Sequence, residues 1–211
     1  MRKIIAFVGP KNGGKDYALE QFKNSANGVD AMLSVDFSDG IRDFVRILTF
    51  GQVDKSISVD VNSQQYRDWK EKDVFKIKDW NTSNDAYPHI ATGRDLLIRI
   101  GEGAKELFGE RIWAKYTVYK VREFLKSVND DSSVLILVGS VRFYYEAAEL
   151  LKSAREFDCA IDFIFCNFNH APKGVEVHET EKLAQLFVDQ DIKHREIITK
   201  QIIEEVCQKS W

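Results

Sequence analysis

Eight consecutive residues near the start of the chain have the types and spacing of a phosphate-binding turn. Gly9 to Asp16 read Gly-Pro-Lys-Asn-Gly-Gly-Lys-Asp and fit the pattern G-x-x-x-x-G-K, with Asp16 where a Ser or Thr usually stands. The glycines allow the backbone to turn tightly and to point several N–H groups at one anion. Lys15 would reach the terminal phosphates of a polyphosphate ligand and neutralise their charge.

The residues on either side of this turn have the context that such a site needs. An apolar run from Lys3 to Val8 has the length of a strand, and a helical pattern begins at about Gly14. A helix that starts here adds the positive end of its dipole to the turn. We therefore expect nucleotide phosphates to bind at Gly9, Lys11, Asn12, Gly13, Gly14, Lys15 and Asp16.

Asp16 is the unusual residue of the turn, because the hydroxyl that normally stands there binds the Mg²⁺ ion of the nucleotide. A carboxylate at this position has several roles open to it. It can bind Mg²⁺ directly or through water, or it can act in catalysis near the γ-phosphate. Alternatively, Asp16 only caps the start of the helix.

The remaining pattern predicts an α/β fold, with a mostly parallel sheet and helices on both faces. Apolar runs predict further strands, and periods of about 3.6 residues predict the helices between them. We expect a single domain over residues 1–211, with a small inserted segment at 52–91 and a lid loop at 167–177. Strands are predicted at 31–37, 134–138, 160–165 and 186–188, and helices at 41–48, 92–108, 112–124, 143–154, 179–186 and 195–207. Thr92 is expected to cap the helix at 92–108, and Gly109 to end it.

Composition excludes several other classes of protein. The formal net charge is -3, whereas binding to the nucleic-acid backbone depends on an excess of Lys and Arg. No apolar stretch approaches the length of a membrane span. The three cysteines (Cys159, Cys166 and Cys207) form neither a CxxC pair nor a metal-binding spacing, which is typical of reduced thiols in the cytoplasm. We expect small-molecule partners, no nucleic acid and no membrane, and a cytoplasmic location.

The turn and several later stretches resemble the deoxynucleoside monophosphate kinases of T-even-type bacteriophages, a family of P-loop kinases. The order Gly-Gly-Lys-Asp in the turn is its most specific feature. The resemblance runs from residue 4 to about residue 205 and is weakest over 52–91. The later stretches are 36–43 (DFSDGIRD), 93–101 (GRDLLIRIG) with Arg111, Ile112 and Trp113, 141–143 (VRF) with Glu146, and 177–181 (VHETE).

This resemblance implies an enzyme that transfers the γ-phosphoryl group of ATP to a deoxynucleoside monophosphate, with Mg²⁺ as cofactor, in the cytoplasm of a phage host. It implies catalytic roles for Lys15, Asp16 and Arg142, and metal binding by Asp16 and Asp36. The residues expected to bind the acceptor are Phe37, Ser38, Arg42, Arg94, Trp113 and Arg142.

Elementary chemistry agrees with the choice of arginines. Arg42, Arg94 and Arg142 each stand at or near the end of a predicted element, where loops line the ligand crevice of a doubly wound sheet. Arginine makes paired hydrogen bonds to phosphate oxygens. Trp113 either stacks on the substrate base or belongs to the core, and Glu146 pairs with Arg142 one turn earlier.

The chain also departs from the family. Ser140 stands where an Asp is expected at a strand end, so Asp16 or Asp36 would carry the acidic role. The lid loop has no arginine, and Tyr17 replaces a small hydroxyl residue. Two alternatives stay open: a P-loop kinase of another small phosphorylated acceptor, and a nucleotide-binding module without turnover. The preferred base and the oligomeric state, including a homodimer, are also open.

Overall fold

The computed structural model describes residues 1–10, 12–48, 64–71, 92–168, 182–189, 192–193 and 196–198. The chain falls into two compact units, which are described separately here. The first unit is formed by Met1–Phe37 together with Ala114–Trp211, and the second by Ser38–Trp113.

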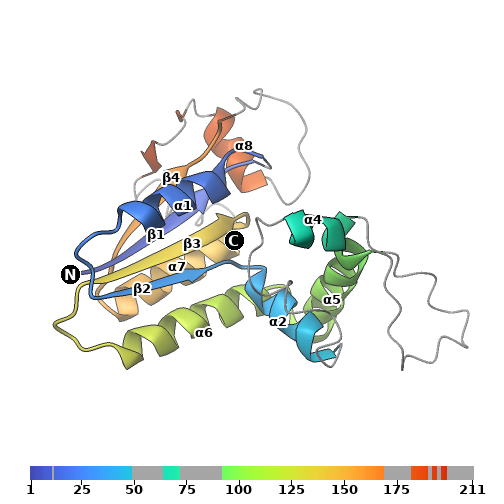
Figure 1. The fold of residues 1–211 in the computed structure, drawn as a ribbon, viewed down its shortest axis with the longest axis horizontal. Helices are drawn as coiled ribbons and strands as arrows, with labels where there is room; N and C mark the ends of the chain where they lie inside the picture. Colours follow the sequence, from blue (N-terminus) through green and yellow to red (C-terminus); the bar gives the residue numbers. More distant parts are fainter. Residues whose placement is uncertain are drawn as a thin grey trace, which may run out of the picture. The chain divides into compact units, whose positions relative to one another are not determined.

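The first unit is built on a five-stranded, mostly parallel sheet with the strand order β2-β3-β1-β4-β5 (Figure 1). The first four strands in this order are parallel, and β5 runs antiparallel to β4. The predicted α/β class with a mostly parallel sheet is therefore confirmed. The strands are β1 (Arg2–Val8), β2 (Ala31–Val35), β3 (Val134–Val141), β4 (Ala160–Phe165) and β5 (Ile197–Ile198).

Side chains of the central strands alternate between two cores, one on each face of the sheet. In β1, Ile4 belongs to one core and Ile5 to the other, as the two-residue period of a strand requires. Helix α1 (Lys15–Ser25) covers the face with Ile5, where the rings of Phe7 and Phe22 meet edge to face at 5.6 Å.

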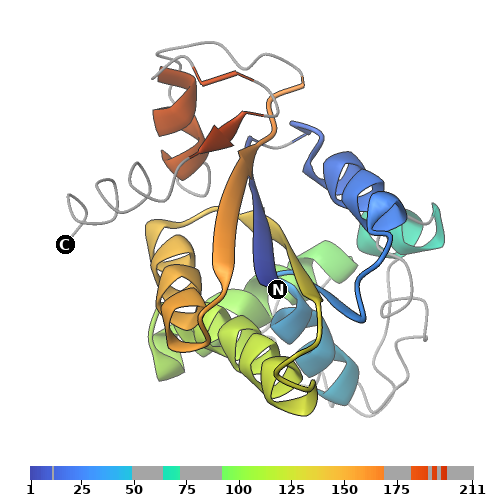
Figure 2. The same ribbon diagram turned by 90° about the vertical axis from the view of Figure 1, so that its left-hand side faces the viewer.

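The opposite face packs against α6 (Ile112–Ser127), α7 (Tyr144–Glu156) and α8 (Lys182–Asp189), which contribute buried residues to the other core. In both ribbon views α1 lies on one side of the sheet and α7 on the other (Figures 1 and 2). Burial of both faces explains why β3 reads as the continuous apolar run VLILV.

Two elements late in the chain differ from the prediction. The residues expected to form a strand at 186–188 belong to helix α8, in which Leu183 and Phe187 are fully buried at helical spacing. A short apolar run alone does not distinguish a strand from a helix. Ile197 and Ile198, expected within the last helix, form β5 and pair with Ile164 and Phe163.

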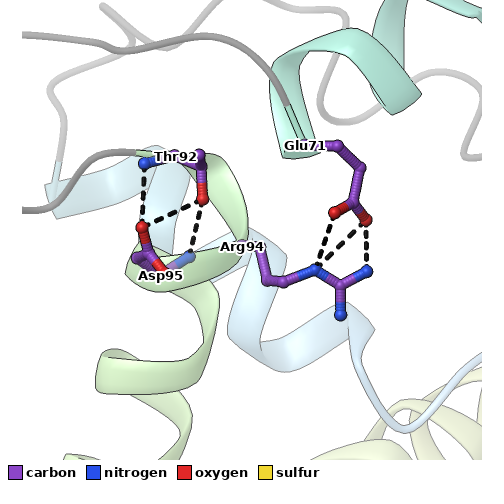
Figure 3. Close-up of polar contacts among 4 residues, drawn as sticks. All are labelled: Glu71, Thr92, Arg94 and Asp95. Carbon is purple, nitrogen blue, oxygen red and sulfur yellow. Dashed lines mark hydrogen bonds and ion pairs between the residues drawn. The ribbon is translucent and has the colours of Figure 1, made fainter.

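The second unit contains three described helices: α2 (Asp39–Leu48), α4 (Gln64–Glu71) and α5 (Gly93–Phe108). The predicted ends of α5 are confirmed. Thr92 and Asp95 form a reciprocal capping box at its start (Figure 3), and Gly109 ends it with a positive φ of 91° and an N–H bond to the Lys105 carbonyl.

The predicted insertion at 52–91 is described only over α4. Helix α4 packs on α5 through Trp69. The indole of Trp69 lies so close to Gly93 that a Cβ atom at that position would collide with it. Tyr66 and Trp69 are buried there and pack with Leu97 as a small separate core.

Candidate functional site

The turn between β1 and α1 packs directly against the chain that leaves β4. A Cβ atom at Gly9 or at Gly13 would collide with the carbonyl oxygen of Cys166. Both positions therefore require glycine. Gly9 is the first glycine of the G-x-x-x-x-G-K pattern, and Gly13 stands directly before its second glycine, Gly14. The same contact was not visible in the sequence, because Cys166 is more than 150 residues away.

Two residues of the turn have positive φ, with values of 60° at Asn12 and 87° at Gly14. Gly14 is the N-cap residue of α1, and no side chain caps that helix end. Asp16 lies in the first turn of α1, so the alternative in which Asp16 caps the helix is wrong. Among the described residues, the backbone N–H groups of Lys15 and Asp16 at the start of α1 are placed to bind a ligand or water.

The side chain of Lys15 is folded into the turn. It is buried, and its Nζ donates to the carbonyl oxygens of Gly9 at 2.8 Å and Pro10 at 2.7 Å. The N–H of Gly13 donates to the same Pro10 carbonyl at 3.0 Å. Lys15 therefore stabilises the closed shape of the turn from inside while its charge stays at the head of α1.

Ionisable groups from four separate segments act on this ammonium group. Burial lowers the pKa of Lys15 below that of an ordinary lysine, and the positive charge of Arg142 lowers it further. Asp16, Cys166 and Asp36 act in the opposite direction. The structure thus brings together Lys15, Asp16, Asp36 and Arg142, which were all predicted from the sequence to belong to the site.

Asp36, which follows β2, places its carboxylate beside the end of β3. Its Oδ2 accepts a hydrogen bond from the N–H of Ser140 at 2.9 Å. Gly139 has no room for a Cβ atom, because the Asp36 carboxylate occupies that space. The end of β3, where the resemblance to the phage kinases predicts an Asp in place of Ser140, therefore has an acidic group supplied by the residue after β2.

The turn from β3 into α7 is held by a buried acid. Oε2 of Glu146 accepts the backbone N–H groups of Arg142 at 2.7 Å and Phe143 at 3.1 Å. Burial raises the pKa of Glu146 to about 7, although these two N–H bonds and the Arg142 charge favour the ionised form. Glu146 was expected to pair with the Arg142 side chain, but these bonds go to the backbone that carries it.

Strand topology places these groups at one edge of the sheet. β1 and β3 are neighbours, yet the chain leaves β1 for α1 on one face and β3 for α7 on the other. Ligands of open α/β sheets bind at such a switch point, outside the carboxyl ends of the strands. Gly9–Lys15 and Ser140–Arg142 are the segments that leave the two strands there.

A cavity of about 330 Å³ lies elsewhere in the first unit, lined by Met1, Arg2, Asp130, Phe157 and Asp158. These residues precede β1, β3 and β4, so the cavity is at the amino ends of the strands. The phosphate-binding turn lies at their carboxyl ends. Loop geometry and charge, rather than this cavity, define the candidate site.

Several of the residues predicted to bind the acceptor belong to the second unit, and each of those described next makes hydrogen bonds within that unit. Arg94 forms a forked ion pair with Glu71, with Nε 2.9 Å from Oε2 (Figure 3). Arg42 donates to the Ser38 hydroxyl at 2.6 Å and pairs with Asp39. The indole N–H of Trp113 donates to the Gly101 carbonyl at 3.0 Å, which is the contact of a packing residue.

Phe37, predicted to line the nucleoside, is buried in the core of the first unit. Lys11 and the greater part of the predicted lid, 169–177, lie outside the described residues. Within the part of the chain that the structure describes, no group of three or more His, Cys, Asp or Glu residues could hold a metal ion. Nor is any helix among the described residues long and apolar enough to cross a membrane.

Comparison with protein-family models, with curated proteins and with solved structures gave no significant match to this chain.

Proposed function

We propose that the chain is a P-loop kinase that transfers the γ-phosphoryl group of ATP to a deoxynucleoside monophosphate. The observation that carries the proposal is the position of Lys15. Its ammonium group lies inside a glycine turn at the head of α1 and is acted on by Arg142, Asp16 and Asp36. Such a reaction would take place in the cytoplasm.

The donor phosphates fit the turn for electrostatic reasons. The positive end of the α1 dipole and the Lys15 ammonium favour an anion at one place. A phosphate group would also reverse the effect that burial has on Lys15, because a nearby negative charge raises the pKa of an ammonium group. ATP binding and the charged state of Lys15 therefore support each other.

Phosphoryl transfer needs positioning and charge neutralisation more than it needs covalent chemistry from the protein. Lys15 would hold the β- and γ-phosphates. Arg142, exposed at the end of β3 and near Lys15, would neutralise charge on the transferred group. Glu146 would hold the turn that carries Arg142 through its two bonds to the backbone.

The acidic residues fit a Mg²⁺ ion that arrives with the nucleotide. Mg²⁺ is usually bound by one or two carboxylates together with substrate phosphates and water. Asp36 and Asp16 both lie close enough to Lys15 to affect its pKa, and they would hold the ion, directly or through water. When bound, the ion would neutralise negative charge on the nucleotide phosphates.

On the acceptor side, the proposal assigns the monophosphate to Arg94 and Arg42. The bidentate ion pair between Arg94 and Glu71 supports this choice, because the edge of a guanidinium group that binds a carboxylate can also bind a phosphate. Identification of the acceptor as a deoxynucleoside monophosphate rests on the resemblance of residues 93–101 and 36–43 to the phage kinases.

The test is to incubate the protein with Mg-ATP and each of the deoxynucleoside monophosphates and to measure ADP and the matching diphosphate. Product with at least one acceptor is expected. Lys15→Met should abolish it, whereas Lys23→Met, at the exposed far end of the same helix, should not. Full activity of Lys15→Met would refute the assignment of the site.

The same assay separates the alternatives. ATP binding without any diphosphate, but with turnover of another phosphorylated metabolite, would indicate a P-loop kinase of a different acceptor. ATP binding without turnover of any acceptor would indicate a nucleotide-binding module.

A further inference from the structure

Two large aromatic side chains beside the phosphate-binding turn are mostly exposed. Tyr17 is 62% exposed and Phe168 is 68% exposed. Phe and Tyr side chains usually bury most of their surface. Both lie at the carboxyl edge of the sheet in the first unit, where the candidate site is, so their exposure there needs a reason.

Phe168 is attached to the turn by its backbone. Its N–H donates to the carbonyl oxygen of Gly13 at 3.0 Å, and its Cβ atom would be 3.4 Å from a Cβ atom built on Gly14. The Phe168 side chain therefore begins close to the head of α1. Tyr17 is in the first turn of the same helix, two residues after Lys15.

The strand order separates the aromatic side of the turn from the charged side. In the order β2-β3-β1-β4, the turn follows the third of these strands. Asp36 and Arg142 follow β2 and β3 on one side of it, and Phe168 follows β4 on the other. The γ-phosphate belongs on the side of the charges, where transfer would take place. The nucleoside of the same molecule must then extend the opposite way, toward β4.

We propose that Phe168, together with Tyr17, forms the surface on which the nucleobase of the phosphoryl donor stacks. This inference rests on the proposed function and names the residues that bind the nucleoside half of the donor. An exposed aromatic ring is suited to this role, because every base has a flat π-face that can stack on it. The turn would then bind the phosphates and the β4 side the base.

The experiment compares two ligands that differ only in the nucleoside. Dissociation constants of Mg-ATP and Mg-tripolyphosphate are measured by calorimetry for the wild-type protein, Phe168→Ala and Phe168→Tyr. Phe108→Ala is the matched control, since Phe108 is 67% exposed and lies at the end of α5 in the second unit.

Phe168→Ala should weaken Mg-ATP binding by about ten-fold or more, the range found when alanine replaces a base-stacking aromatic. Tripolyphosphate binding should stay unchanged in that variant, because the ligand has no base. Phe168→Tyr should retain the wild-type affinity for Mg-ATP, and Phe108→Ala should change neither ligand.

Three results would overturn the inference. Unchanged ATP binding in Phe168→Ala would show that the ring does not contact the donor. An equal loss for ATP and tripolyphosphate would show that Phe168 only supports the turn. A raised KM for the monophosphate with an unchanged ATP constant would place the acceptor base there. Wild-type protein that binds neither ligand would instead refute the proposed function itself.

Discussion

Replacement of Glu146 by Gln should remove a pH-dependent loss of stability from the protein. The carboxyl group of Glu146 is buried, and its pKa in the folded protein is about 7, compared with an ordinary value of 4.5. The folded state therefore binds a proton between about pH 4.5 and pH 7 that the unfolded state does not bind. The stability that this group contributes is fully present below about pH 4.5 and is lost as the pH rises through about 7.

The size of the effect follows from the shift. A difference of about 2.5 units at about 1.4 kcal/mol per unit corresponds to a loss of roughly 3 kcal/mol in the free energy of unfolding. The amide oxygen of Gln can still accept the N–H groups of Arg142 and Phe143, so the turn keeps its hydrogen bonds. The variant loses only the ionisation.

The assay is urea unfolding followed by tryptophan fluorescence at several pH values between about 5 and 8, a window that covers most of this titration. Wild type should lose stability relative to Glu146→Gln as pH rises. Glu149→Gln, on the same helix but outside the turn, is the control and should follow the wild-type curve. If wild type and Glu146→Gln keep a constant difference over the whole range, the pKa of Glu146 is not raised and the reasoning is wrong.

Further predictions concern the turn and the acceptor arginine. Lys15→Met should abolish ATP binding in calorimetry. Because burial lowers the pKa of Lys15, the ATP affinity of the wild-type protein should begin to fall at a pH below the pKa of an ordinary lysine. An ATP affinity that is constant up to about pH 10 would contradict this. Gly13→Ala should lower the melting temperature and weaken ATP binding, because its Cβ atom would meet the Cys166 carbonyl, whereas Gly103→Ala, with open space around it in α5, should stabilise the protein by about 1 kcal/mol in thermal unfolding. A Gly13→Ala protein as stable as wild type would show that the turn can move away from β4. Arg94→Ala should raise the KM of the monophosphate far more than the KM of ATP in steady-state kinetics, and an unchanged acceptor KM would remove Arg94 from the site.

Local features of the site could be predicted from the sequence because the residues involved are adjacent. The phosphate-binding turn needs a strand, two glycines and a helix start within one short segment, and all of these stand in order from Lys3 to Lys15. The ends of α5 could be predicted for the same reason, since Thr92 and Gly109 cap the helix to which they are adjacent in sequence.

Contacts between distant segments were not predictable. Asp36 and Ser140 are separated by 104 positions, and only the pairing of β2 with β3 brings the carboxylate to the strand end. Likewise, glycine is required at position 13 because a Cβ atom there would collide with the backbone carbonyl of Cys166. This contact does not depend on the side chain of residue 166, so the residue type gave no signal.

For Glu146, the sequence predicted the right partner residue, Arg142, but the wrong group of that residue. Spacing of four residues predicted an ion pair with the Arg142 side chain. The first N–H groups of a helix lack partners within the helix and lie within reach of an acid in its first turn. Once Glu146 is buried, the backbone N–H groups of Arg142 and Phe143 are the donors that it reaches.

The central claim is that the backbone from Asn12 to Asp16 encloses a polyphosphate. It is tested most directly by recording ¹⁵N–¹H spectra of the protein while Mg-tripolyphosphate is added. The amide signals of Gly14, Lys15 and Asp16 should move downfield together and saturate, because their N–H groups would donate to phosphate oxygens. Unchanged signals from these three residues, with binding detected elsewhere, would contradict the claim.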